Sequence, residues 1–159
     1  MSEPTRVLFV CLGNICRSPL AEGVFLHLVK EGALEERFEV DSAGTGAWHV
    51  GQPPDQRSAQ VALDHGITLT GRGRQVLPQD LRRYDVILAM DRDNLRDLEE
   101  LARHAEGDAR LHLLRDFDPQ ADGPDVPDPY YGGPSGFEAV YQMVRRSCEY
   151  LLEELTKGE

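Results

Sequence analysis

Short apolar runs alternate with amphipathic stretches along most of the chain. Residues 6–11 form an almost continuous apolar run of strand length, which is typical of a strand buried on both faces of a parallel sheet. Apolar residues then recur at helical spacing up to Gly32, with Ser18 as the expected N-cap and Pro19 in the first turn. The same reasoning predicts further strands at 38–41, 84–90 and 109–114, and further helices at 54–65, 91–103 and 137–155.

The alternation predicts an α/β fold. Strands that alternate with helices imply a four-stranded parallel sheet with helices on both faces. The chain of 159 residues has the length of one domain, and we expect residues 1–159 to form a single one. Ligands of such sheets bind beyond the carboxyl ends of the strands, near the point at which the strand order reverses.

One long segment follows neither period. Residues 115–136 contain five of the ten prolines, which fix φ and remove backbone donors, together with glycines that permit turns. A loop of this length in a compact domain is more often functional than idle. It is therefore a candidate for part of a functional site.

The chain is acidic, with 17 basic against 28 acidic side chains and a net charge of −11. Residues 91–128 hold 12 acidic and 5 basic residues, so most of the excess lies there. Such a surface repels phosphate-rich polymers, and nucleic acid is not an expected partner. No apolar run approaches the roughly 20 residues of a membrane span, and three cysteines are too few and odd in number for a disulfide framework. We expect a cytoplasmic protein with free thiols and no membrane contact.

Residues 11–18, Cys-Leu-Gly-Asn-Ile-Cys-Arg-Ser, connect the first strand to the first helix. A short loop before a helix presents backbone N–H groups to one point, and the helix N-terminus adds about half a positive charge. Gly13 and Asn14 tolerate the left-handed backbone angles that such a loop requires, and Arg17 offers a fork of donors that matches two phosphate oxygens. The segment predicts an anion-binding loop that Cys11 faces.

A cysteine in that position is a candidate nucleophile. A helix N-terminus and a nearby cation both favour the thiolate, and a thiolate aimed at a bound phosphate is suited to covalent phosphoryl transfer without a metal. The alternative is that Cys11 is a buried core residue and Gly13-Asn14 a plain turn. No Gly-x-Gly-x-x-Gly and no Gly-Lys-Ser/Thr occurs, and Cys11 and Cys16 have no second Cys or His pair at zinc-finger spacing. We expect no metal and no cofactor.

Residues 7–25, VLFVCLGNICRSPLAEGVF, closely resemble the low-molecular-weight protein tyrosine phosphatase family. The segments 41–44, 48–51, 90–94 and 128–132 resemble further landmarks of that family, in the same order. The resemblance implies a four-stranded parallel sheet with flanking helices. It also implies a cytosolic enzyme that takes phosphotyrosine-containing proteins as substrates and releases inorganic phosphate through a phosphocysteine intermediate.

The resemblance also implies roles for individual residues. Cys11 would be the nucleophile, Arg17 the phosphate clamp and Asp128 the general acid and base. Ser18 would hydrogen-bond the Cys11 sulfur and help it leave as thiolate. Asp128 is one of five aspartates in its loop, and only the resemblance distinguishes it. The residues implied to bind phosphate or line the cleft are Leu12, Gly13, Asn14, Ile15, Cys16, Ser18, Trp48, Tyr130 and Tyr131.

Two further features concern the support and regulation of the loop. Asn14, Ser18 and Ser42 match a hydrogen-bond network that holds the family's loop, but a histidine often found as a fourth member is replaced by Gly71. Cys16 resembles the thiol that forms a reversible disulfide with the nucleophile under peroxide, and a structural role is its alternative.

Related activities are the nearest alternatives. Arsenate reductases of this fold use a further pair of mid-chain cysteines, and none lies between Cys16 and Cys148, which we expect in the core. Protein arginine phosphatases usually carry threonine where Ile15 stands. A non-catalytic phosphopeptide-binding module and a thiol redox sensor are alternatives of another class, but binding alone needs neither the thiol of Cys11 nor the acid Asp128. We expect a monomer.

Overall fold

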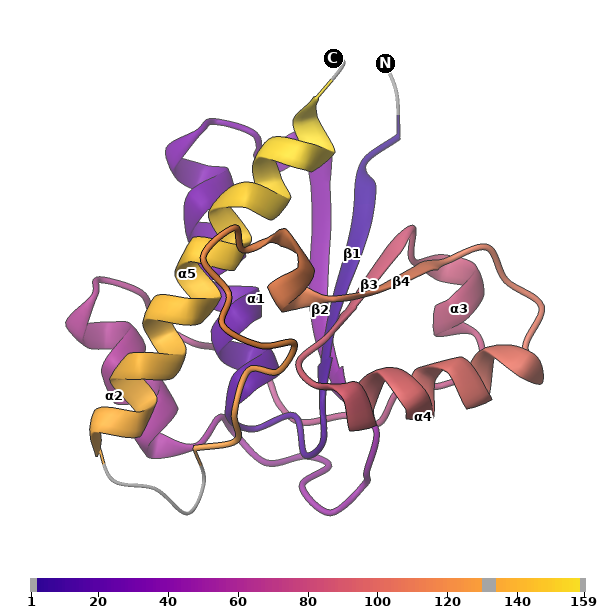
Figure 1. The fold of residues 1–159 in the computed structure, drawn as a ribbon, viewed down its shortest axis with the longest axis horizontal. Coiled ribbons are helices and arrows are strands. Elements are labelled where there is room, and N and C mark those ends of the chain that lie inside the picture. Colours follow the sequence, from indigo (N-terminus) through magenta and orange to yellow (C-terminus); the bar gives the residue numbers. More distant parts are fainter. Residues whose placement is uncertain (1–2, 130–133, 158–159) are drawn as a thin grey trace.

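The computed structural model describes residues 3–129 and 134–157 (Figure 1). Strands and helices alternate along it, as the sequence predicts. In chain order the elements are β1 (Thr5–Cys11), α1 (Arg17–Glu31), η1 (Glu35–Arg37), β2 (Phe38–Gly44), α2 (Gln56–Asp64), α3 (Asp80–Arg83), β3 (Val86–Ala89), α4 (Arg92–Arg103), β4 (Arg110–Leu113), η2 (Leu114–Phe117) and α5 (Pro134–Thr156), where η marks a short 3₁₀ helix.

The four strands form one parallel sheet in the order β2-β1-β3-β4, which confirms the predicted fold. Phe9 of β1 lies opposite Ser42 of β2 on one side and Leu88 of β3 on the other. The chain runs from β1 to β2 on one side and then to β3 on the other side. The carboxyl ends of β1 and β3 therefore flank the point at which the strand order reverses, where ligands of such sheets bind.

Side chains of β1 alternate between two cores. Phe9 and Cys11 belong to a cluster covered by α1, α2 and α5, whereas Leu8 and Val10 belong to a second cluster beneath α3 and α4. Figure 1 shows these two groups of helices on opposite faces of the sheet. Both faces of β1 are thus buried, which is why its sequence is an unbroken apolar run rather than an alternating one.

Helix α1 begins at Arg17 with Cys16 as its N-cap, so the prediction that Ser18 caps it is wrong. The Ser18 hydroxyl instead contacts Asn14 and Cys11, and the helix begins two residues earlier than predicted, at Arg17 rather than at Pro19. In α2, the residues Ser58, Val61 and Ala62 face the core, and 57% of Leu63 is exposed.

The segment 115–136 is shorter as a loop than predicted. Its first residues lie inside η2, and its last ones belong to α5, which starts at Pro134. Proline is compatible with the first turn of a helix, because the backbone N–H that it lacks has no partner within the helix there. Helix α3 was not predicted, since four residues are too few to show a helical period.

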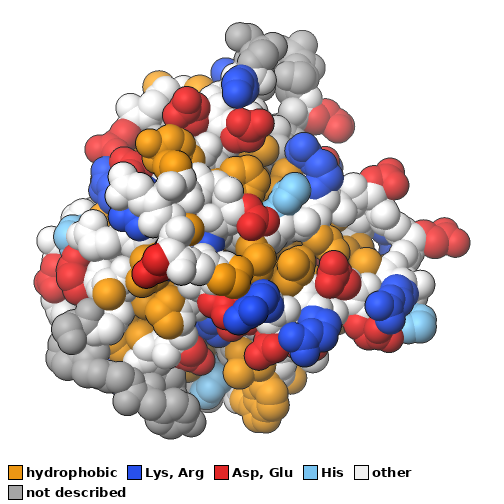
Figure 2. Space-filling model, viewed as in Figure 1, with side chains coloured by type: hydrophobic (Ala, Val, Ile, Leu, Met, Phe, Trp, Pro, Cys, Tyr) orange, Lys and Arg blue, Asp and Glu red, His pale blue; other side chains and the backbone are white. Residues whose placement is uncertain are grey.

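No helix in the described part of the chain is long and apolar enough to cross a membrane. Figure 2 shows acidic and basic side chains interspersed along α4.

Candidate active site

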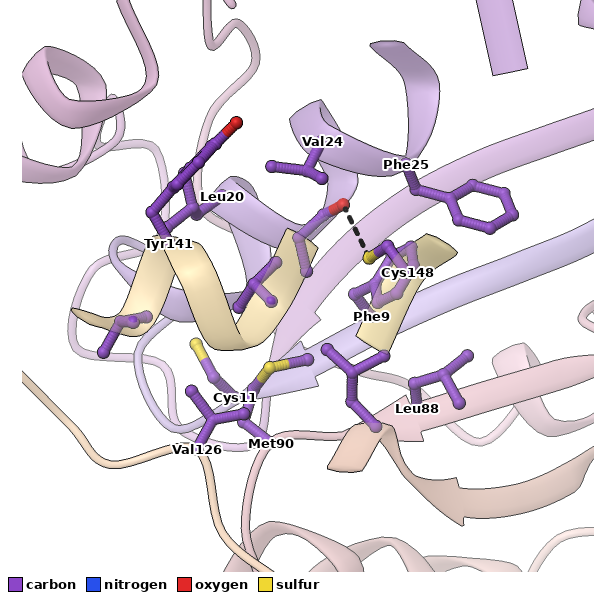
Figure 3. Packing of buried hydrophobic residues seen from close by; sticks show 14 of the residues in the cluster. Phe9, Cys11, Leu20, Val24, Phe25, Leu88, Met90, Val126, Tyr141 and Cys148 are labelled. Carbon is purple, nitrogen blue, oxygen red and sulfur yellow. Dashed lines mark hydrogen bonds between the residues drawn. The ribbon is translucent and has the colours of Figure 1, made fainter. Parts of the chain in front are cut away.

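Three segments meet at the carboxyl edge of β1 and β3. They are the loop 12–16, Asp91 two residues after the end of β3, and residues 126–128 of the long loop. Val126 is fully buried, and its N–H donates to the Met90 carbonyl at 2.7 Å. Figure 3 shows Cys11, Met90 and Val126 at one end of the larger hydrophobic cluster. The predicted location of the site is therefore the place at which these segments come together.

The carbonyl groups of the loop point outward. Those of Cys11 and Leu12 accept from the N–H groups of residues 45–46, each at 2.9 Å. The Ile15 carbonyl accepts from the Asp55 N–H at 2.7 Å. In a trans peptide the carbonyl of one residue and the N–H of the next residue point in opposite directions. The N–H groups of residues 12, 13 and 16 therefore face the inside of the loop. This geometry makes an anion-binding nest.

Asn14 holds the loop in this shape. It has φ = +57°, a left-handed conformation that asparagine tolerates better than most residues. Its Nδ2 donates to Ser18 Oγ at 2.9 Å and to Ser42 Oγ at 3.0 Å, so the structure brings together the three residues of the predicted network. Its Oδ1 accepts from the Arg74 N–H at 2.9 Å. A backbone donor three residues after Gly71 is thus the third partner of the Asn14 side chain.

Two donors point at the sulfur of Cys11. The Asn14 N–H donates to Sγ at 3.3 Å, and Ser18 Oγ lies 3.0 Å from Sγ. The Ser18 hydroxyl also lies 3.4 Å from the Ala43 carbonyl, but an ionised sulfur has no hydrogen to give, so toward a Cys11 thiolate Ser18 is the donor. This arrangement stabilises negative charge on a sulfur that is only 2% exposed.

Arg17 is 3% exposed and lies beside the nucleophile candidate. Its Nη1 donates to Asp91 Oδ2 at 2.6 Å and to the Val126 carbonyl at 2.9 Å, and its Nη2 lies 3.8 Å from Asp128 Oδ2. Burial lowers the pKa of Arg17, but the negative charges of Cys11 and Asp91 outweigh burial and raise it. Asp91 was not predicted as a site residue, although its position shortly after a central strand could have indicated it.

A cleft of about 440 Å³ opens over the loop. Trp48, which is 71% exposed, and Leu12, which is 42% exposed, lie at its rim, and Asp128 lies on another side. Tyr130 and Tyr131 lie outside the described residues. Among the residues that the structure describes, the cleft is lined by Cys11, Leu12, Gly13, Ile15, Cys16, Arg17, Trp48, His49 and Asp128, and of these only His49 was not predicted.

The other two cysteines have different surroundings. Burial raises the pKa of Cys16 to about 12, so this residue is a neutral thiol at physiological pH. Cys148 is fully buried as predicted, with its Sγ 3.9 Å from the Ala21 carbonyl (Figure 3). All three cysteines are free.

Glu22 extends the network behind the loop and was not predicted. Ser42 Oγ donates to Glu22 Oε1 at 2.7 Å, so Glu22 is linked through Ser42 and Asn14 to Ser18. Burial raises the pKa of Glu22 to about 7, even though the hydrogen bond from Ser42 lowers it. A single glutamate inside an amphipathic helix gives no signal of this kind in the sequence.

Among residues 3–129 and 134–157, no group of three or more His, Cys, Asp or Glu side chains could hold a metal ion.

The fold and the loop define a parallel α/β protein with a cysteine and a buried arginine on one nest at the carboxyl edge of its sheet. The model of the family "Low molecular weight phosphotyrosine protein phosphatase" matches residues 6–159. The chain belongs to this family.

Individual relatives agree with the family assignment. A low molecular weight phosphotyrosine protein phosphatase of Gallus gallus is 44% identical over 153 residues, which cover 96% of each chain. The crystal structure of YfkJ from Bacillus subtilis has 41% identity and a TM-score of 0.92, covering 99% of this chain and 98% of that one. That of an arginine phosphatase from drosophila has 36% identity and a TM-score of 0.91, covering 96% of this chain and 99% of that one.

Proposed function

We propose that the protein hydrolyses phosphotyrosine in protein substrates through a phosphocysteine intermediate on Cys11. The observation that carries this proposal is the pairing of Cys11 with the buried Arg17 on one nest of inward N–H groups. The nest and Arg17 bind the phosphate oxygens, and Asn14 N–H and the Ser18 hydroxyl lie within hydrogen-bond distance of the attacking sulfur of Cys11.

In the first step the Cys11 thiolate attacks phosphorus. A sulfur–phosphorus bond forms, and the bond between phosphorus and the tyrosine oxygen breaks. Asp128 gives its proton to that oxygen, so that tyrosine leaves as a neutral phenol. The developing charge on the phosphate oxygens is stabilised by the N–H groups of the loop and by Arg17, which stays charged.

In the second step water replaces the sulfur. Asp128, now a carboxylate, takes a proton from the water as its oxygen bonds to phosphorus. The sulfur–phosphorus bond breaks, and Cys11 leaves as a thiolate that the Ser18 hydroxyl stabilises from 3.0 Å. Inorganic phosphate is the product, and no cofactor takes part.

The walls of the cleft favour an aryl group over a short aliphatic one. Leu12 and Ile15 offer apolar surface beside Cys11, and the exposed indole of Trp48 offers a flat one. We include Tyr130 and Tyr131 in the proposed substrate site on the family resemblance alone. A phosphoserine side chain is too short to use these surfaces while its phosphate is in the nest.

Two candidate activities stay as alternatives. Phosphoarginine hydrolysis is favoured by the similarity to the drosophila arginine phosphatase, and is opposed by Ile15 at the loop position where that activity usually has threonine. Arsenate reduction is opposed by the lack of cysteines between Cys16 and Cys148.

We further propose that the enzyme acts as a cytoplasmic monomer. Its three free thiols support a reducing compartment, and its net charge of −11 opposes nucleic acid as a partner.

We also propose that Cys16 protects the nucleophile from oxidation. Peroxide oxidises the Cys11 thiolate to a sulfenic acid and is itself reduced to water. The Cys16 thiol then attacks that sulfur, a disulfide forms, and water leaves. Both side chains line the same cleft, where an external thiol can later reduce the disulfide.

The experiment is a comparison of one peptide carrying phosphotyrosine, phosphoserine or phosphoarginine, with arsenate reduction measured in parallel. We expect phosphotyrosine to have the highest kcat/KM, and we expect a metal chelator to leave the rate unchanged. Full turnover by Cys11→Ser, or a preference for phosphoarginine, would contradict the proposal.

A further inference from the structure

Three arginines from three elements hold one dipeptide of the long loop, Asp125–Val126. Arg17 donates to the Val126 carbonyl at 2.9 Å. Arg92, the first residue of α4, donates to the Asp125 carboxylate from its backbone N–H at 2.9 Å and from Nη2 at 3.3 Å. Arg115 of η2 donates to the Asp125 carbonyl at 3.2 Å. The dipeptide is thus fixed from the loop 12–16 side, from α4 and from η2.

The held dipeptide is joined to Asp128 by a stiff link. Val126 is fully buried and also donates to the Met90 carbonyl (Figure 3). Only Pro127, whose ring fixes φ, separates it from Asp128, and Pro129 restricts Asp128 to extended backbone. A displacement of Val126 is therefore passed on to the carboxylate of Asp128 rather than absorbed by the chain.

Of these three arginines only Arg17 lines the cleft, and Arg115 is buried outside it whereas Arg92 is exposed. The side chain of Arg115 is 3% exposed and lies under the long loop. Besides the Asp125 carbonyl, it donates to Met143 Sδ at 3.2 Å on α5 and to Asp122 Oδ1 at 3.0 Å, and its Nε lies 3.8 Å from Asp118 Oδ2. It joins α5 and both halves of the loop in one cluster, and it can affect the chemistry only through the loop.

We propose that Arg115 is a positioning residue for the general acid: by holding the Asp125 carbonyl it sets where Asp128 stands above the phosphate nest. This inference rests on the proposed function, because it takes Asp128 as the acid. A general acid must come within about 2.6–3.2 Å of the leaving oxygen, and a misplacement of about 1 Å can cost a factor of about 100. Arg115 has no hydrogen bond to Cys11, to the loop 12–16 or to Arg17, and Arg17 has a second partner in Asp91 if Val126 moves, so the loss of Arg115 should affect the acid step most.

The test compares kcat/KM for two substrates that differ in their need for an acid. Phenyl phosphate has a poor leaving group and requires protonation, whereas 4-nitrophenyl phosphate has a good one. We expect Arg115→Met to lower kcat/KM about tenfold for phenyl phosphate and less than about twofold for 4-nitrophenyl phosphate. Asp128→Ala should show the same selectivity with a larger loss, of about 100-fold, because a general acid contributes about 10²–10⁴-fold.

Arg146→Met is the matched control. Arg146 donates to Asp118 at 2.7 Å in the same charged cluster, but its hydrogen bond does not involve residues 125–126. We expect it to lower the unfolding temperature as Arg115→Met does while leaving the ratio of the two kcat/KM values unchanged. An equal loss on both substrates in Arg115→Met, or no loss, would overturn the proposal.

A second variant covers the case in which Arg115→Met does not fold. Asp125→Ala removes the partly exposed carboxylate that Arg92 holds, and it should show the same selective loss on phenyl phosphate. Equal losses there would also contradict the proposal. Failure of the proposed function looks different, because the wild-type protein would then turn over neither substrate, or Asp128→Ala would show no selectivity.

Discussion

Asp91 Oδ2 accepts a 2.6 Å hydrogen bond from Arg17 Nη1, so one carboxylate joins the carboxyl end of β3 to the first residue of α1. Its other oxygen accepts from the Asn94 N–H at 2.8 Å and caps α4. Asp91 is therefore both a helix cap and the group that orients the buried guanidinium. The remaining N–H groups of Arg17 are left to face the cleft in a fixed plane.

The change Asp91→Asn separates these two roles. Asparagine is as good an N-cap as aspartate, so stability should change little, but the hydrogen bond to Arg17 loses its charge. We expect kcat/KM for an aryl phosphate to fall about tenfold or more, since a hydrogen bond between charged groups contributes about 1.5–3 kcal/mol. Asp93→Asn, in the same turn and 83% exposed, is the control and should leave kcat/KM unchanged. Unaltered activity in Asp91→Asn would show that Arg17 needs no partner.

The left-handed Asn14 makes a prediction about the origin of the loop's shape. Asn14→Ala loses the side-chain hydrogen bonds and is strained at φ = +57°, whereas Asn14→Gly loses only the hydrogen bonds. We expect the Ala variant to be less stable than the Gly variant by about 1 kcal/mol in urea unfolding, and both to lose most of their activity. Full activity in Asn14→Gly would mean that the network does not hold the loop.

Glu22 makes a prediction about stability and pH. Its pKa is raised to about 7 in the folded protein, against about 4.3 in an unfolded chain. The folded state therefore binds the proton more tightly, so the contribution of Glu22 is fully present below about pH 4 and is lost as the pH rises to about 7. Relative to Glu22→Gln, the wild-type protein should lose on the order of 2 kcal/mol between pH 5 and pH 8.

Urea unfolding of both proteins across this range measures the difference. Glu99→Gln, at an exposed carboxylate on α4, is the control and should give a difference that does not vary with pH. A constant difference for Glu22→Gln as well would show that Glu22 is ionised throughout the range.

The proposed protection by Cys16 is tested by oxidation. After brief treatment with peroxide, the wild-type protein should recover its activity with dithiothreitol, because the disulfide stops the oxidation of Cys11 at a reducible stage. Cys16→Ala should be inactivated irreversibly by the same treatment. Cys148→Ala is the control, since Cys148 is fully buried in the core, and it should recover like the wild type. Recovery of Cys16→Ala would contradict the proposed role.

The elements that the sequence predicted well are those with a long apolar period. The strand that ends at Cys11 is buried on both faces, and its unbroken run of apolar residues shows this directly. The cap of α1 was predicted wrongly, because Ser18 is a good cap by type and only the folded loop shows that its hydroxyl is used by Asn14 and Cys11. Residue type alone does not distinguish a cap from a member of a network.

The part of the site that the sequence missed consists of partners rather than of reactive groups. Cys11 and Arg17 lie six residues apart and form a visible motif. Asp91, Glu22 and Arg115 reach the site from separate elements, and Glu22 and Arg115 look like ordinary surface charges in the sequence. The position of Asp91 after a central strand is a signal of a site, but no signal identifies Arg17 as its partner, because such pairings arise only when β3, α1 and η2 are packed.

The most direct test of the central claim is to trap the intermediate on Cys11. The wild-type protein is mixed with a ³²P-labelled phosphotyrosine peptide and quenched in acid during turnover, and the labelled fragment is identified by mass spectrometry. We predict label on Cys11 and none in Cys11→Ser. With ³²P-labelled 4-nitrophenyl phosphate in place of the peptide, we predict more label in Asp128→Ala than in the wild type, because hydrolysis of the intermediate is slowed while its formation needs no acid. Turnover without label on Cys11, or label on another residue, would contradict the account.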